Sequence, residues 1–122
     1  MTARPLRVFV VEDHPDTARG LKLYLQAQGH VVLLAGDVTS ALRVAEQNQF
    51  DVLLSDLGLP DGNGWELLQQ LRSLGPVKAI AMSGYNSDAD LERSQRAGFL
   101  QHLPKPLMPE TLNAALQSAA AC

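Results

Sequence analysis

The feature that most constrains the fold is the segment Leu6–Val11, in which residues 8–11 are all apolar. Continuous apolarity is typical of a strand covered on both faces, as in a parallel sheet between two layers of helices. Four more short apolar runs follow, separated by segments with helical spacing of their apolar residues, over residues 31–35, 51–55, 77–82 and 100–103. This alternation predicts an α/β fold built on a parallel sheet.

The segments between the runs predict five helices. The first begins near Pro15, which suits a first helical turn, and ends at Gly29. The second is capped by Asp37 or Thr39. The segment 87–97 has a weak apolar face, because Leu91 is its only large apolar residue. The third and last helices have apolar residues in helical register, at Leu67, Leu71 and Leu74 and at Leu112, Ala115, Leu116 and Ala119.

Length and composition are those of an ordinary globular protein. The 122 residues suit a single domain over 1–122, and the 46% hydrophobic and 19% charged residues argue against disorder. A net charge of −3 without a basic cluster predicts no direct binding of nucleic acid or of an anionic membrane.

The chain also lacks the sequence signals of export. No apolar stretch approaches the roughly 20 residues that a membrane span needs, and residues 1–5 begin no signal peptide. We therefore expect a cytoplasmic protein. The only cysteine is Cys122, so no disulfide forms within the chain, and we interpret this terminal thiol as incidental.

Polar residues follow the predicted strands at the point where each one ends. Glu12 and Asp13 follow the first strand, Asp56 the third, Ser83 the fourth and Lys105 the fifth. Open parallel sheets place ligands beyond the carboxyl ends of their strands. We therefore expect these five residues to gather at one edge of the sheet.

The chemistry of these residues indicates a phosphoryl site. Three carboxylates close together repel each other unless a cation binds, and oxygen-only ligands favour Mg²⁺. Lys105 adds a positive charge, and Ser83 adds a hydroxyl donor. Together they predict that one of these carboxylates is the nucleophile that forms an aspartyl phosphate.

The chain resembles the receiver domains of response regulators in two-component signalling, from about Leu6 to the final helix. Six pieces in order carry the resemblance: Val-Glu-Asp at 11–13, Leu-Ser-Asp at 54–56, Leu-Pro-Asp-Gly-Asn-Gly at 59–64, Met-Ser-Gly at 82–84, Ala97-Gly98 and Lys105-Pro106.

The resemblance implies a flavodoxin-like (βα)5 fold with strand order 2-1-3-4-5 and helices on both faces. It implies that Asp56 is the phosphoacceptor and that Ser83 and Lys105 contact the phosphoryl oxygens. It also implies a cis peptide bond between Lys105 and Pro106. The implied Mg²⁺ ligands are Asp13, Asp56, the backbone carbonyl of Gly58 and, through water, Glu12.

The resemblance further implies a switch, a donor and a site of output. Ser83 and His102 occupy the positions that transmit phosphorylation to the face formed by the fourth helix, fifth strand and fifth helix, which is also a possible homodimer interface. The donor would be a sensor histidine kinase or a histidine phosphotransfer protein. His102 within its surrounding motif is most similar to receivers attached to hybrid histidine kinases. The chain is then a stand-alone receiver or part of a larger protein.

The chain departs from the family pattern at two positions, and three other functions are alternatives to that of a phosphoacceptor. Gly58 and Tyr85 are uncommon residues beside the pocket. Because these positions influence dephosphorylation in the family, the resemblance does not predict the lifetime of the phosphoryl group on this chain.

An aspartate-nucleophile phosphohydrolase usually has a second aspartate two residues after the first, where this chain has Gly58. A flavin or nucleotide binder would not place Glu12 and Asp13 in its phosphate loop. The last alternative hypothesis is an adaptor that has the receiver fold but acts independently of phosphorylation.

Three other residues have structural interpretations. His14 is expected in a loop beside the pocket rather than on the metal, because Mg²⁺ prefers oxygen ligands. His30 begins a strand and has no partner that the sequence reveals. Trp65 packs in the first turn of a helix, near enough to the pocket to report on it by fluorescence.

Overall fold

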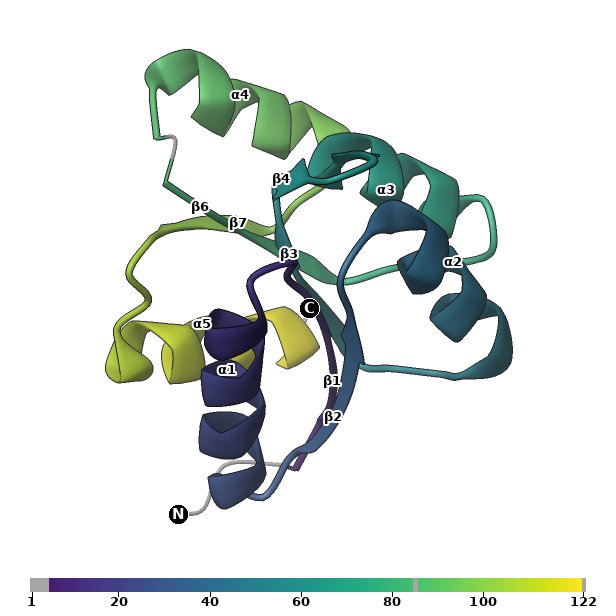
Figure 1. Cartoon of the computed structure of the whole chain (residues 1–122). Coiled ribbons are helices and arrows are strands. Elements are labelled where there is room, and N and C mark those ends of the chain that lie inside the picture. The colour runs from purple at the N-terminus through teal and green to yellow at the C-terminus, as the bar shows by residue number, and fades with distance from the viewer. Residues whose placement is uncertain (1–4, 85, 122) are drawn as a thin grey trace.

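The computed structural model describes residues 5–84 and 86–121, so the expectations for Tyr85 and Cys122 fall outside the described residues. The chain forms a five-stranded sheet of order β2-β1-β3-β6-β7, in which every pairing is parallel (Figure 1). In chain order these five strands are arranged 2-1-3-4-5, so the predicted flavodoxin-like fold is confirmed. The strands are β1 (Arg7–Val11), β2 (Val31–Ala35), β3 (Val52–Asp56), β6 (Ala79–Ser83) and β7 (Gln101–Pro104).

Helices cover both faces of the sheet (Figure 1). One face packs against α1 (Pro15–Ala27) and α5 (Pro109–Ala121). The other packs against α2 (Val38–Gln47) and α3 (Gly64–Arg72), with α4 (Asp88–Ala97) beside α3 and β7. Two hydrophobic cores result, one on each side of the sheet.

The β1 strand shows why its sequence is continuously apolar. Val8 and Val10 belong to the core beneath α1 and α5, whereas Phe9 and Val11 belong to the core beneath α2 and α3. All four residues are fully buried. Since successive side chains of a strand point to opposite faces, only a strand covered on both sides buries every residue in this way.

The starts of the first two helices follow the predicted signals. Pro15 is the first residue of α1, and Gly29, just beyond the end of the helix, has a φ of 94°. Asp37 is the N-cap of α2, because its side chain accepts a hydrogen bond from the Ser40 N–H at 2.7 Å. Thr39 lies inside the helix, which settles the choice between the two candidate caps.

Three local features were not predicted. The turn-rich loop after β3 contains a short antiparallel pair, β4 (Gly58–Leu59) and β5 (Gly62–Asn63). The third helix ends at Arg72, so Leu74 is not in its register and is 60% exposed. Gly75, with a φ of 155°, turns the chain at this point, and β6 then begins at Ala79 rather than at Val77.

The α4 helix is held weakly by apolar contacts, as its sequence predicted. Of its ten residues only Ser94 is buried, and Leu91 is 40% exposed. Its ends are well capped: Ser87 and Asp90 form a reciprocal capping box, and Gly98 adopts a left-handed conformation at the C-terminus.

His30 has a partner that the sequence did not reveal. Its side chain is buried, and its Nδ1 accepts a hydrogen bond from the Leu6 N–H at 3.0 Å. Burial lowers the pKa of His30 below its ordinary value. The residue therefore ties the start of β2 to the residue that precedes β1.

In residues 5–84 and 86–121, we find no helix with the length and apolar character that crossing a bilayer requires.

Candidate functional site

The carboxyl ends of the strands bring the predicted residues to one edge of the sheet. Glu12 directly follows β1, and its N–H donates to the Ala35 carbonyl at 3.0 Å. Asp56 is the last residue of the neighbouring strand β3. Lys105 directly follows β7, and its N–H donates to the Ser83 carbonyl at 2.9 Å.

The Lys105 side chain lies between two of the carboxylates. Its Nζ is 2.6 Å from Glu12 Oε1 and 2.7 Å from Asp56 Oδ2. The Glu12 side chain is fully buried, whereas those of Asp56 and Lys105 are 13% and 27% exposed. Glu12 and Asp56 precede Lys105 by 93 and 49 positions in the sequence, and the fold brings all three together into a preformed charged site.

Burial and pairing act on the two ends of this contact in opposite ways. Burial raises the pKa of Glu12, and hydrogen bonds from Lys105 and from the His14 backbone oppose that rise. Burial lowers the pKa of Lys105, but its hydrogen bonds to Asp56 and Glu12 outweigh burial, so the pKa of Lys105 is raised. Lys105 is therefore a charged ammonium at neutral pH.

Asp13 and His14 lie beside Glu12 at the same edge. One ligand atom from each of the three residues lies within 4.8 Å of the others. His14 Nδ1 is 3.9 Å from Glu12 Oε2 and 3.8 Å from Asp13 Oδ1. The carboxylate oxygens of Glu12 and Asp13 are hard donors that suit Mg²⁺, and Asp56 is connected to Glu12 through the Lys105 ammonium that both contact.

The loop after β3 is packed closely against the end of that strand. The Gly58 N–H donates to Asp56 Oδ1 at 3.2 Å. A Cβ atom at Gly64 would lie 2.5 Å from the Asp56 carbonyl oxygen, so only glycine lets α3 begin so close to β3. The sequence analysis used Gly64 only as part of the segment 59–64 that carries the family resemblance, so this role was not predicted.

Asp61 connects the same loop to α2. Its carboxylate accepts hydrogen bonds from the N–H groups of Val38 and Thr39 at 2.7 and 3.0 Å, and from Thr39 Oγ1 at 2.8 Å. The backbone hydrogen bonds lower the pKa of Asp61. These donors are the unpaired amides of a helix start, so Asp61 supplies a cap from a distant loop. The sequence gave no sign of this partner.

Ser83 and His102 lie on adjacent strands. Ser83, the last residue of β6, is buried, and His102 in β7 is paired with Ala81 of β6. His102 Nδ1 lies 2.7 Å from the Oγ of Ser94 in α4. The Lys105–Pro106 peptide bond is cis, as the resemblance implied.

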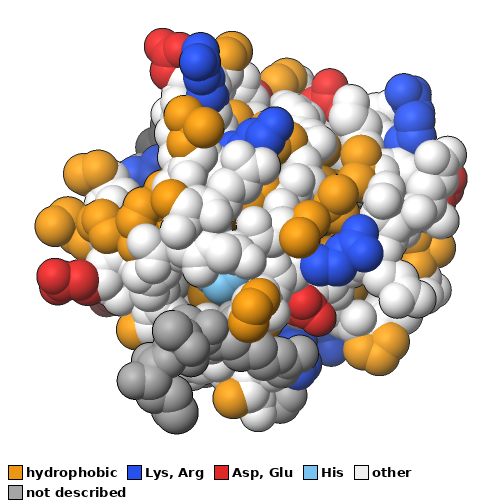
Figure 2. All heavy atoms as spheres, turned by 90° about the horizontal axis from the view of Figure 1, so that it is seen from below, with side chains coloured by type: hydrophobic (Ala, Val, Ile, Leu, Met, Phe, Trp, Pro, Cys, Tyr) orange, Lys and Arg blue, Asp and Glu red, His pale blue; other side chains and the backbone are white. Residues whose placement is uncertain are grey.

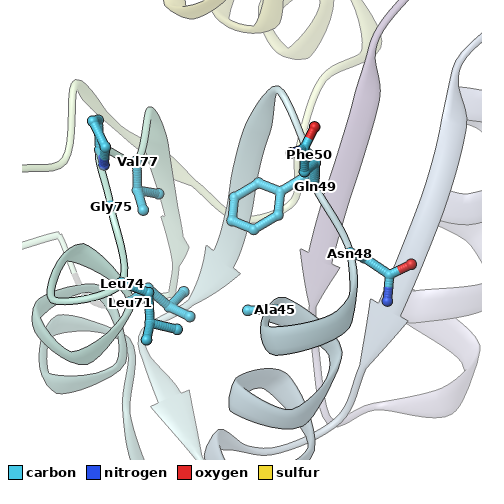
Figure 3. Close-up of a pocket in the computed structure, with 9 residues that line it drawn as sticks. Ala45, Asn48, Gln49, Phe50, Leu71, Leu74, Gly75 and Val77 are labelled. Carbon is cyan, nitrogen blue, oxygen red and sulfur yellow. The ribbon is translucent and has the colours of Figure 1, made fainter.

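A second concave region lies at the opposite end of the sheet. It is a hollow of about 370 Å³ between the loops that precede β3 and β6, lined by side chains that include Phe50, Leu71 and Val77 (Figure 3). Figure 2 views the molecule from below, and the hydrophobic side chains on this face form several separate groups. The hollow lies at the amino-terminal ends of the strands, so it is distinct from the site around Asp56.

Comparison with known proteins identifies the family. The model of the response regulator receiver domain matches residues 8–117. The chain therefore belongs to the response regulator receiver domain family.

Relatives of known sequence place such domains in several kinds of protein. A 14.6 kDa protein from the sodA1 3′ region of Leptolyngbya boryana is 32% identical over 88% of this chain and 85% of its own length. The transcriptional regulatory protein KdpE of Mycobacterium tuberculosis is 32% identical over 92% of this chain. The sensor histidine kinase RcsC of Salmonella typhimurium is 32% identical over 91% of it. This chain spans 50% of KdpE and 12% of RcsC, so the similarity covers one part of each.

Solved structures agree with this assignment. The CheY-like receiver domain protein of Methanospirillum hungatei has a TM-score of 0.90 and 28% identity, and the match covers 97% of this chain and 95% of that one. A response regulator of Burkholderia pseudomallei, solved with a phosphorylated aspartic acid and a calcium ion, has a TM-score of 0.86 and 29% identity. That match covers 94% of this chain and 68% of that one.

Proposed function

We propose that this chain is the phosphoacceptor of a two-component or phosphorelay system, with Asp56 as the residue that is phosphorylated. The single observation that carries the proposal is the Lys105 ammonium held between Glu12 and Asp56 at 2.6 and 2.7 Å. Under this proposal residues 1–122 form one receiver domain. It acts in the cytoplasm and receives its phosphoryl group from a sensor histidine kinase or a histidine phosphotransfer protein.

In the proposed reaction, an Asp56 carboxylate oxygen forms a bond to the phosphorus of a phosphohistidine. The phosphorus–nitrogen bond breaks, and the imidazole leaves and takes up a proton. Lys105 offsets the negative charge of the transferred group, and the Ser83 hydroxyl donates a hydrogen bond to a phosphoryl oxygen. The chain then catalyses its own phosphorylation and the later hydrolysis of its aspartyl phosphate, and it acts on no external substrate.

The proposed metal is Mg²⁺, held by Asp13, Asp56, the Gly58 carbonyl and, through water, Glu12. The oxygen donor set at the ends of β1 and β3 supports this choice. When bound, the ion supplies positive charge that neutralises the carboxylates and the incoming phosphoryl group. The Burkholderia pseudomallei response regulator, solved with a phosphorylated aspartic acid and a calcium ion, supports a proposal that combines aspartate phosphorylation with a divalent cation.

The proposed output surface is the face formed by α4, β7 and α5, switched through Ser83 and His102. Leu91 and Leu100, which are 40% and 46% exposed, offer apolar area on α4 and just before β7. This face would bind a downstream protein or a second copy of the chain, with no direct contact to nucleic acid or to a membrane.

The alternative hypotheses about function make different predictions for the same site. A phosphohydrolase that follows the usual pattern needs a general acid two residues after its nucleophile, where Gly58 has no side chain. An adaptor that ignores phosphorylation would not respond to a phosphoryl analogue.

Beryllofluoride, which mimics a phosphoryl group on a carboxylate, tests the proposal. Titration in the presence of Mg²⁺ should change the fluorescence of Trp65, and Asp56→Asn should abolish the change. Omitting Mg²⁺ should also abolish it. An absent response in the wild type, or an equal response in Asp56→Asn, would contradict the proposal.

A further inference from the structure

The Ser94 hydroxyl joins three elements of the fold. Ser94 is the one buried residue of α4, and its Oγ lies 2.9 Å from Trp65 Nε1 at the start of α3. The same oxygen lies 2.7 Å from Nδ1 of His102 in β7. The guanidinium of Arg93 lies over the face of the Trp65 ring, 4.1 Å from its centroid.

The chemistry of these groups fixes the direction of the Trp65–Ser94 hydrogen bond, and the direction of the Ser94–His102 bond is inferred from it. An indole N–H can only donate, so the Ser94 oxygen accepts from Trp65. The Ser94 O–H can then donate to His102 Nδ1, which lies 2.7 Å from the Ser94 Oγ. We infer that Trp65, Ser94 and His102 form a polarised relay, in which Ser94 positions the His102 ring as the tautomer that carries its proton on Nε2.

The relay restrains the residue that occupies the switch position. His102 is paired with Ala81, two residues before Ser83, and its ring is tied to α4 through Ser94. A ring that turns away from α4 breaks this bond and leaves a buried hydroxyl without its acceptor, which is unfavourable. If the ring turns toward Ser83 on phosphorylation, as the switch proposed above requires, Ser94 acts as a latch that favours the unphosphorylated arrangement of His102 and α4.

Removing the latch has a directional consequence. Ser94→Ala removes the hydrogen bond to His102 and so destabilises the unphosphorylated arrangement. It does not affect the activated arrangement in the same way, because the Ser94–His102 bond is already broken there. The balance between the two then shifts toward the activated form, and ligands of that form bind more tightly. One hydrogen bond of ordinary net strength corresponds to a change of about 2- to 10-fold. This latch role rests on the proposed function, whereas the polarity of the relay does not.

The first experiment observes the His102 tautomer. The protein is labelled with ¹⁵N-histidine, and the His102 signals are assigned with a His102→Phe variant. We expect Nδ1 to appear as an unprotonated nitrogen and Nε2 as a protonated one in the wild type. Ser94→Ala should move both signals toward those of a tautomer mixture, and Ser94→Thr should restore them. A protonated Nδ1 in the neutral wild-type ring would overturn the inferred polarity.

The second experiment tests the latch. Occupancy of Asp56 by beryllofluoride with Mg²⁺ is followed by ¹⁹F NMR, which does not depend on His102. Beryllofluoride should shift the wild-type Nδ1 signal and should bind Ser94→Ala about 2- to 10-fold more tightly. An unmoved Nδ1 signal at full occupancy, or equal binding by both proteins, would overturn the latch and leave the proposed function intact.

Two further outcomes are separable. If beryllofluoride fails to bind the wild type, the proposed function fails and the latch role fails with it, but the tautomer result still decides the polarity. If Ser94→Ala does not fold, Trp65→Phe removes the donor at the other end of the relay and leaves Ser94 in place. That variant should also shift the His102 nitrogen signals toward a mixture, and unchanged signals would contradict the relay.

Discussion

At the scale of the residue, Lys105 is the group on which the site depends. Its ammonium pairs with Glu12, whose side chain is fully buried, and with Asp56. A buried carboxylate without a partner is strongly unfavourable, so this contact stabilises the ionised form of Glu12 and opposes the rise in its pKa that burial causes. The same ammonium repels any metal ion that approaches these carboxylates, because like charges a few ångströms apart interact strongly in a partly buried site.

We therefore expect opposite effects of Lys105→Met on two measurements. Affinity for Mg²⁺, measured by titration of Trp65 fluorescence, should rise by about tenfold, because a competing cation is removed. Formation of acyl phosphate should fall by about tenfold or more, because the group that offsets the phosphoryl charge is lost. Lys22→Met in α1 removes the same charge elsewhere on the molecule and serves as the control. Weaker Mg²⁺ binding by Lys105→Met would contradict this account.

His30 predicts a pH dependence of stability. Its folded-state pKa is lowered below 6.5, so the unfolded chain binds the proton more readily. Stability is then full above about pH 6.5 and falls as the pH decreases toward the folded-state pKa. Urea midpoints at about pH 7.5 and about pH 5.5 measure the loss.

His30→Asn provides the control, because its side-chain oxygen can still accept the Leu6 N–H but does not titrate. The variant should lose less stability than the wild type between the two pH values. An equal loss in both proteins would show that His30 is not responsible.

At the scale of the element, α4 depends on its caps more than on its apolar face. Ser94 is its only buried residue, while Ser87 and Asp90 form the capping box. Ser87→Ala should destabilise this helix by about 0.5–2 kcal/mol, seen as faster amide hydrogen exchange within α4. Asp37→Ala removes the N-cap of α2, which buries Val38 and Ala41, and should open that helix less. Unchanged exchange in α4 would contradict the prediction.

Gly64 makes the start of α3 specific for glycine. Gly64→Ala would bring a methyl group to 2.5 Å from the Asp56 carbonyl oxygen, and we expect a loss of about 1–3 kcal/mol in the free energy of unfolding. Gly20→Ala in α1 is the matched control, since nothing lies within 4 Å of its Cβ position. That change should stabilise the helix by about 0.5–1 kcal/mol. Urea unfolding compares the two, and a harmless Gly64→Ala would refute the close approach.

Element types were predictable because each is encoded locally. The apolar run 8–11 and the helix signals at Pro15 and Asp37 need no distant partner to be interpreted. The end of α3 at Arg72 was missed because Leu74 continues the helical spacing of apolar residues. Gly75, which turns the chain just beyond it, was not used to place the end of the helix. The pair of short strands after β3 was missed because glycine-rich segments indicate turns without indicating how they pair.

At the scale of the whole molecule, topology explains which part of the site the sequence could predict. Parallel strands share one carboxyl edge, so Glu12, Asp56 and Lys105 were expected together, and the structure brings them together. The relay through Ser94 and the cap from Asp61 depend on side chains that meet across separate elements. No local pattern in the sequence encodes such contacts, so only the three-dimensional structure reveals them.

The central claim is that Asp56 becomes an acyl phosphate in a reaction that needs a divalent cation. Incubation with acetyl phosphate and Mg²⁺, followed by intact mass measurement and site mapping, tests it most directly. We predict one added phosphoryl group on Asp56, which hydroxylamine releases, and none in the presence of a chelator or in Asp56→Asn. A phosphoryl group on another residue, or equal labelling without Mg²⁺, would contradict the claim.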